Sequence, residues 1–157
     1  MDARKLTNIS NAAISALVLS MENMGINLSL IWSQLANAFQ DEHIRGILND
    51  LGLQVKGDDV KSITESFMDE MMKSGMIQRM NVTSASDTEI VLDLGDCVFT
   101  QAGHAARGEG RDIIPPCSIM AILYSIINRT TGKNLQITKY EFKPETNSCY
   151  FTIKVEE

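Results

Sequence analysis

The chain has 157 residues, of which 44% are hydrophobic and 22% are charged. This is the ordinary composition of a globular domain, and it argues against intrinsic disorder. The formal net charge is -6, and the basic residues are scattered along the chain. A nucleic acid or an anionic membrane surface is therefore not an expected partner, because both need clustered lysine and arginine side chains.

Neither a membrane span nor a secretory signal is expected. The longest apolar stretch, about residues 113–127, contains two prolines and is shorter than the roughly 20 residues that a spanning helix needs. Arg4 and Lys5 precede an apolar run near the N-terminus, but Asn8 and Asn11 interrupt its pattern. Three cysteines in a chain of this size do not form a disulfide framework. We expect a cytoplasmic protein with reduced thiols.

The first half of the chain, about residues 1–75, is predicted to be helical. Apolar residues recur at helical spacing over residues 3–24, over residues 28–51 with a break near Asp41, and over residues 60–72. Glycine, which commonly ends a helix, follows each of these segments: Gly25, Gly52 and Gly75.

The second half, about residues 76–157, is predicted to contain two β-hairpins joined by a buried helix. The helix, residues 117–128, is apolar on almost all sides, and a glycine-containing loop over residues 96–112 precedes it. The sequence therefore predicts a single α+β domain over residues 1–157, in which the N-terminal helices pack on a four-stranded antiparallel sheet. The expected strands span residues 76–83, 88–94, 135–142 and 149–155.

No catalytic signature is present. The chain lacks a dinucleotide-binding glycine motif, a phosphate-binding loop, a nucleophile elbow and a Cys-x-x-Cys pair. The loop over residues 103–111 has glycines and two arginines, and it is either an anion-binding loop or a solvated loop with no ligand. The sequence does not indicate an enzyme.

Four residues form the candidate metal site, namely Cys97, His104, Cys117 and Cys149. Each cysteine is predicted at the edge of a secondary-structure element, near the same end of the fold. Zinc prefers four thiolate or imidazole ligands in a tetrahedron, which three cysteines and one histidine provide. No two of these residues are closely spaced, so ordinary buried or reactive thiols are the alternative.

Two local features bear on these cysteines. Cys117 is predicted at the start of a helix, where the N-terminus favours the thiolate. Strict alternation along the second strand puts Cys97 on the same face as Asp93, away from the core, unless Gly95 bulges the strand.

A second candidate site is an apolar ligand pocket. Five methionines fall between residues 68 and 80, and methionine adapts its shape at surfaces that bind varied apolar partners. The alternatives are core packing and a dimer face. The residues expected to line the pocket are Trp32, Phe39, Phe67, Met71 and Ile122.

Residues 116–127, residues 131–133 and residues 145–154 together resemble the end of the 4-vinyl-reductase-like family, also described as hydrocarbon-binding domains. The likeness rests on a cysteine before an apolar helix and on a closing strand of the kind Cys-aromatic-Phe-x-Ile. It implies a small-molecule-binding or regulatory role. It also implies a metal site that includes Cys117 and Cys149 and, more weakly, Cys97; His104 follows from the residue types alone.

The first functional hypothesis is therefore a small-molecule-binding or sensory domain for a hydrophobic ligand, with a Cys/His zinc site. The alternative is a homodimeric assembly module, paired through the N-terminal helices, in which the metal is structural or absent. A redox or metal enzyme that uses the Cys117 thiolate is the third hypothesis.

Overall fold

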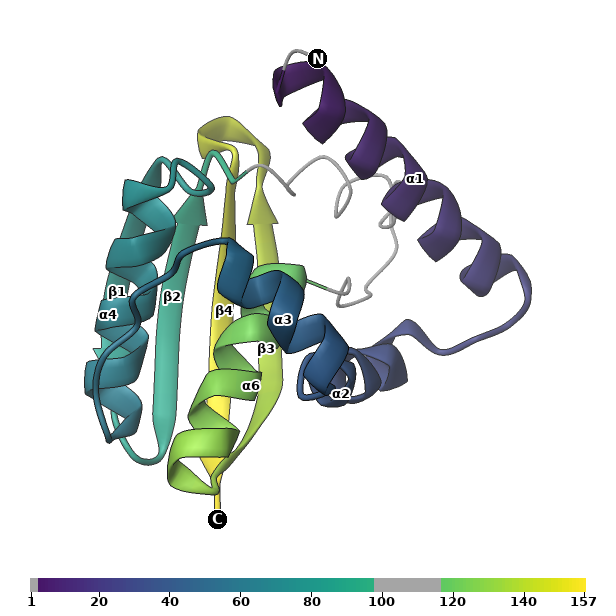
Figure 1. Ribbon diagram of the computed structural model, residues 1–157. Helices are drawn as coiled ribbons and strands as arrows, with labels where there is room; N and C mark the ends of the chain where they lie inside the picture. Colours follow the sequence, from purple (N-terminus) through teal and green to yellow (C-terminus); the bar gives the residue numbers. More distant parts are fainter. Residues whose placement is uncertain (1–2, 98–116) are drawn as a thin grey trace.

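The computed structural model describes residues 3–97 and 117–157, and it confirms the predicted α+β class (Figure 1). Four antiparallel strands form one sheet in the order β1-β2-β4-β3, so the second hairpin joins the first through β4 on β2. The described elements are α1 (Ala3–Asn23), α2 (Leu28–Ala38), α3 (Glu42–Asp50), α4 (Val60–Lys73), β1 (Arg79–Ala85), β2 (Glu89–Gly95), α6 (Ser118–Thr131), β3 (Asn134–Lys143), the 3-10 turn η1 (Pro144–Thr146) and β4 (Ser148–Glu156).

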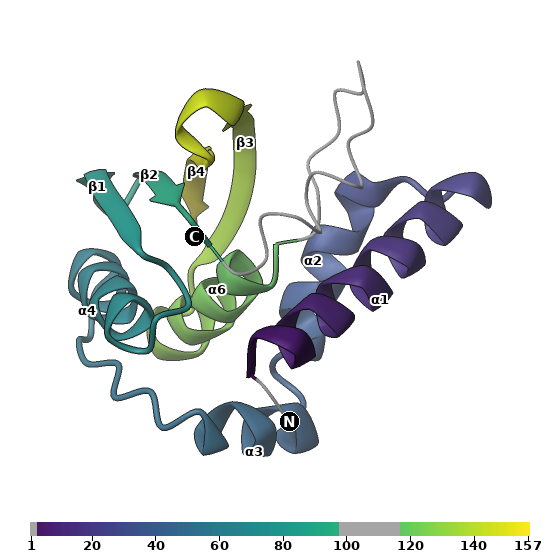
Figure 2. The ribbon, with the colours of Figure 1, turned by 90° about the horizontal axis from the view of Figure 1, so that it is seen from above.

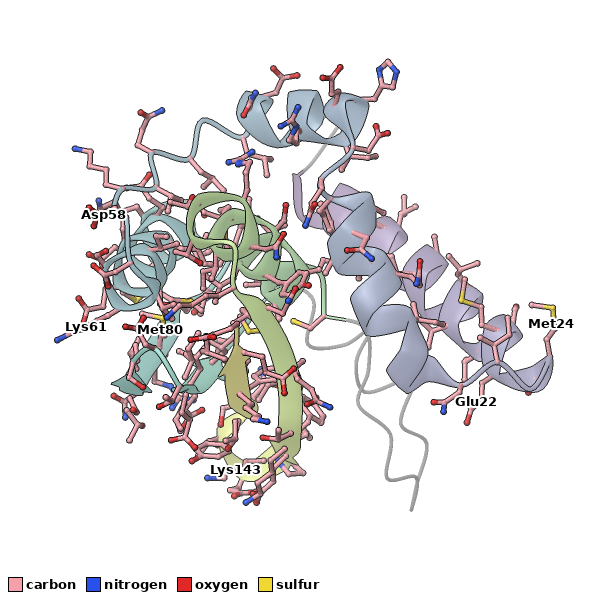
Figure 3. The ribbon with its side chains drawn as sticks, turned by 90° about the horizontal axis from the view of Figure 1, so that it is seen from below. Glu22, Met24, Asp58, Lys61, Met80 and Lys143 are labelled. Carbon is pink, nitrogen blue, oxygen red and sulfur yellow. The ribbon has the colours of Figure 1, made fainter. Side chains whose placement is uncertain are left out.

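The helix boundaries follow local capping. The predicted break near Asp41 is confirmed, because its carboxylate accepts a hydrogen bond from the backbone N–H of His43 and so begins α3. Asp59 caps α4 in the same way, and Ser62 reciprocates in a capping box. Asp58 and Lys61 flank this cap at the exposed end of α4 (Figure 3).

Helices α4 and α6 lie side by side on one face of the sheet (Figure 2). The predicted alternation in β4 is confirmed, because Phe151, Ile153 and Val155 are buried beneath these helices. Helix α6 is buried over nearly its whole length, as its apolar sequence predicted. The two helices and the inner face of the sheet therefore enclose the main core.

The opposite face of the sheet is polar. Tyr150 lies there between two lysines, and the ammonium groups of Lys139 and Lys143 stand 5.5 and 5.2 Å from the centre of its ring. Within residues 3–97 and 117–157, no helix covers this face (Figure 2).

Helix α1 lies apart from the sheet (Figure 1) and contacts α2. Val18 is the buried centre of that contact. The side chains of Ile9 and Leu17 are 62% and 56% exposed, and Met24 projects from the far end of the helix (Figure 3). In the part of the chain described, no helix is both long and apolar enough to cross a membrane.

Candidate functional site

The three cysteines come from three elements that meet at one end of the sheet. Cys97 follows β2 by two residues, Cys117 is the N-cap residue of α6, and Cys149 is the second residue of β4. Cys149 lies between Leu94 of β2 and Phe142 of β3 in the sheet register. All three are half-buried, pack against the main core and form no disulfide.

The thiols are close enough to interact electrostatically. Burial raises the pKa of the Cys117 thiol strongly, and negative charge on Cys97 and on Cys149 raises that pKa further. Cys97 and Cys149, which are 20 and 32 positions from Cys117 in the sequence, therefore lie near it in the fold. We refer to Cys97, Cys117 and Cys149 as the thiol cluster.

The structure corrects the prediction that Cys117 is a thiolate. The backbone N–H groups of Met120 and Ile119, at the first turn of α6, do lower the pKa of this thiol. Burial among core side chains outweighs them, so the net shift of the pKa is upward and the thiol is neutral at pH 7. A reactive Cys117 thiolate, which the enzyme hypothesis needed, is therefore not favoured.

Cys97 reaches the core through a turn that strand alternation did not predict. Asp96 adopts a left-handed conformation with φ of 53°, which takes the chain out of the pleat after Gly95. Its backbone N–H donates to the carbonyl oxygen of Asn147, and the Asn147 amide donates to its carboxylate at 2.8 Å. This pairing ties the end of β2 to the turn before β4, and Cys97 packs against the core.

Tyr140 is a member of the site that sequence reasoning missed. Its hydroxyl lies 3.4 Å from the sulfur of Cys149, with either group able to donate. The ring also packs on Phe151, with 5.0 Å between centroids. Tyr140 precedes Phe142, the register partner of Cys149, by two residues on the same face of β3, so alternation in the two strands could have found it.

The ligand geometry of the site is incomplete in the described part of the chain. His104 lies outside residues 3–97 and 117–157. Among the residues described, no group of three or more histidine, cysteine or acidic side chains stands at the mutual spacing that holds a metal ion. The donor types fit zinc, but the three thiols must draw together and a fourth ligand must join them.

Four of the predicted ligand-pocket residues lie in or against the main core. Phe67 and Met71 of α4 are fully buried there, and Ile122 of α6 lies there at 7% exposure. Phe39 is partly buried, packs against this core and also lines a small cavity beside α3. Trp32 belongs to α2, but its side chain lies outside the described part of the structure. The hydrophobic pocket remains a prediction.

Comparison of the chain with protein-family models, with curated proteins and with solved structures found no match.

Proposed function

We propose that this chain is a small-molecule-binding or regulatory domain, and that its thiol cluster takes up a zinc ion. The observation that carries the proposal is the approach of Cys97 and Cys149 to Cys117, from elements far apart in sequence. The likeness of the C-terminal third to hydrocarbon-binding domains agrees with it. Cysteine sulfurs are a ligand type that zinc prefers in structural sites.

Zinc binding at this point has a physical cost. Ligation needs thiolates, so zinc must displace the proton that burial holds on Cys117. Cys97, Cys117 and Cys149 would hold the ion, which would link the end of β2, the start of α6 and β4. The sequence-predicted fourth ligand is His104, and Tyr140 is placed to orient Cys149 by a hydrogen bond.

We propose a hydrophobic ligand because of where the thiol cluster lies. All three cysteines pack against the core that contains Phe67 and Met71. A hydrophobic molecule bound beside the cluster would enter this core, and the flexible methionine side chain is suited to repacking around it. Extraction of natively purified protein with organic solvent, followed by mass spectrometry, identifies such a molecule.

Zinc affinity of cysteine variants tests the metal part of the proposal. We expect one zinc ion per chain under reducing conditions, measured by competition with a chromophoric chelator. Each of the substitutions Cys97→Ser, Cys117→Ser and Cys149→Ser should weaken binding at least about tenfold, because each removes one ligand. Ser118→Ala, next to Cys117 on α6, is the matched control and should bind as wild type.

Far-ultraviolet circular dichroism shows whether each serine variant keeps the fold. Wild-type protein that binds no zinc, or folded cysteine variants that bind zinc as tightly as wild type, would overturn the metal site.

The second candidate function is homodimeric assembly, which a second apolar stripe on α1 favours. Ile9 and Leu17 fall within about a quarter of the helix circumference at 3.6 residues per turn, and the exposed Met24 directly follows the helix. Val18, which packs on α2, is on the other side. An exposed apolar stripe opposite a packed one is typical of a helix that also contacts a partner.

Light scattering after size exclusion tests this assembly. We expect a dimer for the wild type and a monomer for Leu17→Glu, because a charge in the stripe must lose water on association. Leu51→Glu places the same change at a 43%-exposed leucine off this helix and should remain dimeric. A wild-type monomer, or equal dissociation of both variants, would contradict the assembly.

A further inference from the structure

A second pocket lies toward the other end of α6, away from the thiol cluster. It has a volume of about 70 Å³ and opens between α3 and the last turns of α6. Three apolar side chains, Phe39, Leu53 and Ile126, form part of its wall. The rest of the lining is polar and comes from two helices.

The polar lining consists entirely of hydrogen-bond donors or groups that can donate. Arg45 and Asn49 are four residues apart on α3, and Ser125 and Arg129 are four residues apart on α6, so each pair shares one helix face. Among the described residues, no carboxylate is part of the lining. The two guanidinium groups are positively charged, so this lining attracts anions.

Arg45 carries a donor that is not satisfied. Its Nε is buried and has no hydrogen-bond partner within the described structure. The ion pair of Arg45 with Glu42 is long, at 3.7 Å, and the Glu42 side chain is 90% exposed, so water screens it. A buried donor without an acceptor is unfavourable.

A polar network lies next to the pocket. The Gln40 amide, after α2, donates to Asn128 of α6 at 2.9 Å. Asn128 in turn donates to the carbonyl oxygen of Lys133 at 3.1 Å. This network ties the segment between α2 and α3 to the end of α6, beside the residues that line the pocket.

Size and charge together define the ligand. An apolar cavity of about 150 Å³ accommodates benzene, so a pocket of half that volume takes a smaller group. We propose that this pocket binds a small oxyanion, either a carboxylate or a phosphate group, between Arg45 and Arg129. The fork of guanidinium donors matches the oxygens of both groups. This site goes beyond the zinc and hydrophobic-ligand proposal and does not depend on it.

Nuclear magnetic resonance of the arginine Nε–H groups tests the site. The wild-type chain is titrated with inorganic phosphate, with acetate and with chloride at constant ionic strength. We expect saturable one-to-one shifts of the Arg45 and Arg129 signals with phosphate or with acetate, and none with chloride. Saturation with phosphate identifies a phosphate site, and saturation with acetate identifies a carboxylate site.

Charge-matched variants separate this pocket from general attraction of anions. Arg45→Gln and Arg129→Gln should each weaken binding at least tenfold, read from the remaining arginine signal. Arg79→Gln removes an equal charge on β1, where the guanidinium donates to the carbonyl oxygen of Thr146, and should bind as wild type. The backbone spectrum reports folding, and Ser125→Ala is the second test if an arginine variant alters it.

Two results would overturn the proposal. Shifts with phosphate and acetate that are no larger than those with chloride would mean that the pocket holds water only. If Arg79→Gln weakened anion binding as much as Arg45→Gln, binding would depend on net charge alone and not on this pocket.

Discussion

Phe67→Ala is expected to lower the free energy of unfolding by about 3–5 kcal/mol. Phe67 has 0% exposure and sits where α4 packs on the sheet, so truncation removes the contacts of a whole ring. The surrounding side chains belong to two helices and a sheet and can collapse only partly into the space. A loss of this size is a large fraction of the roughly 5–15 kcal/mol that stabilises a typical domain.

Urea denaturation of wild type and variant measures this loss. Met72→Ala is the matched control, because Met72 is on the same helix and 36% exposed, and we expect it to cost less than about 1 kcal/mol. A similarly small cost for Phe67→Ala would contradict the tight packing of α4.

Zinc affinity is expected to rise steeply with pH. Burial and the neighbouring thiols raise the pKa of Cys117, so this group is protonated throughout the neutral range. Zinc binding must release that proton, and lowering the proton concentration therefore favours the bound state. Between about pH 6 and pH 7 the affinity should increase about tenfold for each thiol proton released, hence up to about a thousandfold for the three cysteines.

Chelator competition at several pH values, with the chelator calibrated at each, measures this slope. Cys117→Ser should reduce the number of protons released by one, because serine has no proton to lose in this range. An affinity that does not change with pH would mean that zinc, if bound, is not held by the thiols.

Much of the fold could be predicted because its elements have strong local signals. The alternation of Phe151, Ile153 and Val155 fixed the buried face of β4, and the apolar sequence of α6 indicated a central helix. These patterns depend only on which residues avoid water. The break at Asp41 was also visible, since a short carboxylate caps the following helix.

The candidate site was predicted less completely, because it depends on contacts between distant residues. Strict alternation put Cys97 on the face away from the core unless Gly95 bulged the strand, but Asp96 turns the chain in a conformation stabilised by Asn147. Similarly, the helix start at Cys117 predicted a thiolate, whereas burial in the assembled core keeps the proton in place. Neither the contact between Asn147 and Asp96 nor the depth of burial at Cys117 can be predicted from the neighbouring sequence.

No sequence pattern indicated the pocket that Arg45 and Arg129 line. Arg45 and Arg129 are 84 positions apart, and each resembles an ordinary charged residue on the exposed face of a helix. Only the packing of α3 near the end of α6 brings them to one cavity. The loop over residues 103–111, which did have a sequence signal for anion binding, lies outside the described residues.

A native mass spectrum of untagged chain, prepared anaerobically and without chelator, tests the central claim most directly. The thiol cluster predicts that each chain exceeds its denatured mass by one zinc ion, and that Cys117→Ser loses this excess. A native mass equal to the denatured mass, in protein supplied with zinc, would contradict the account and leave the three cysteines as core thiols.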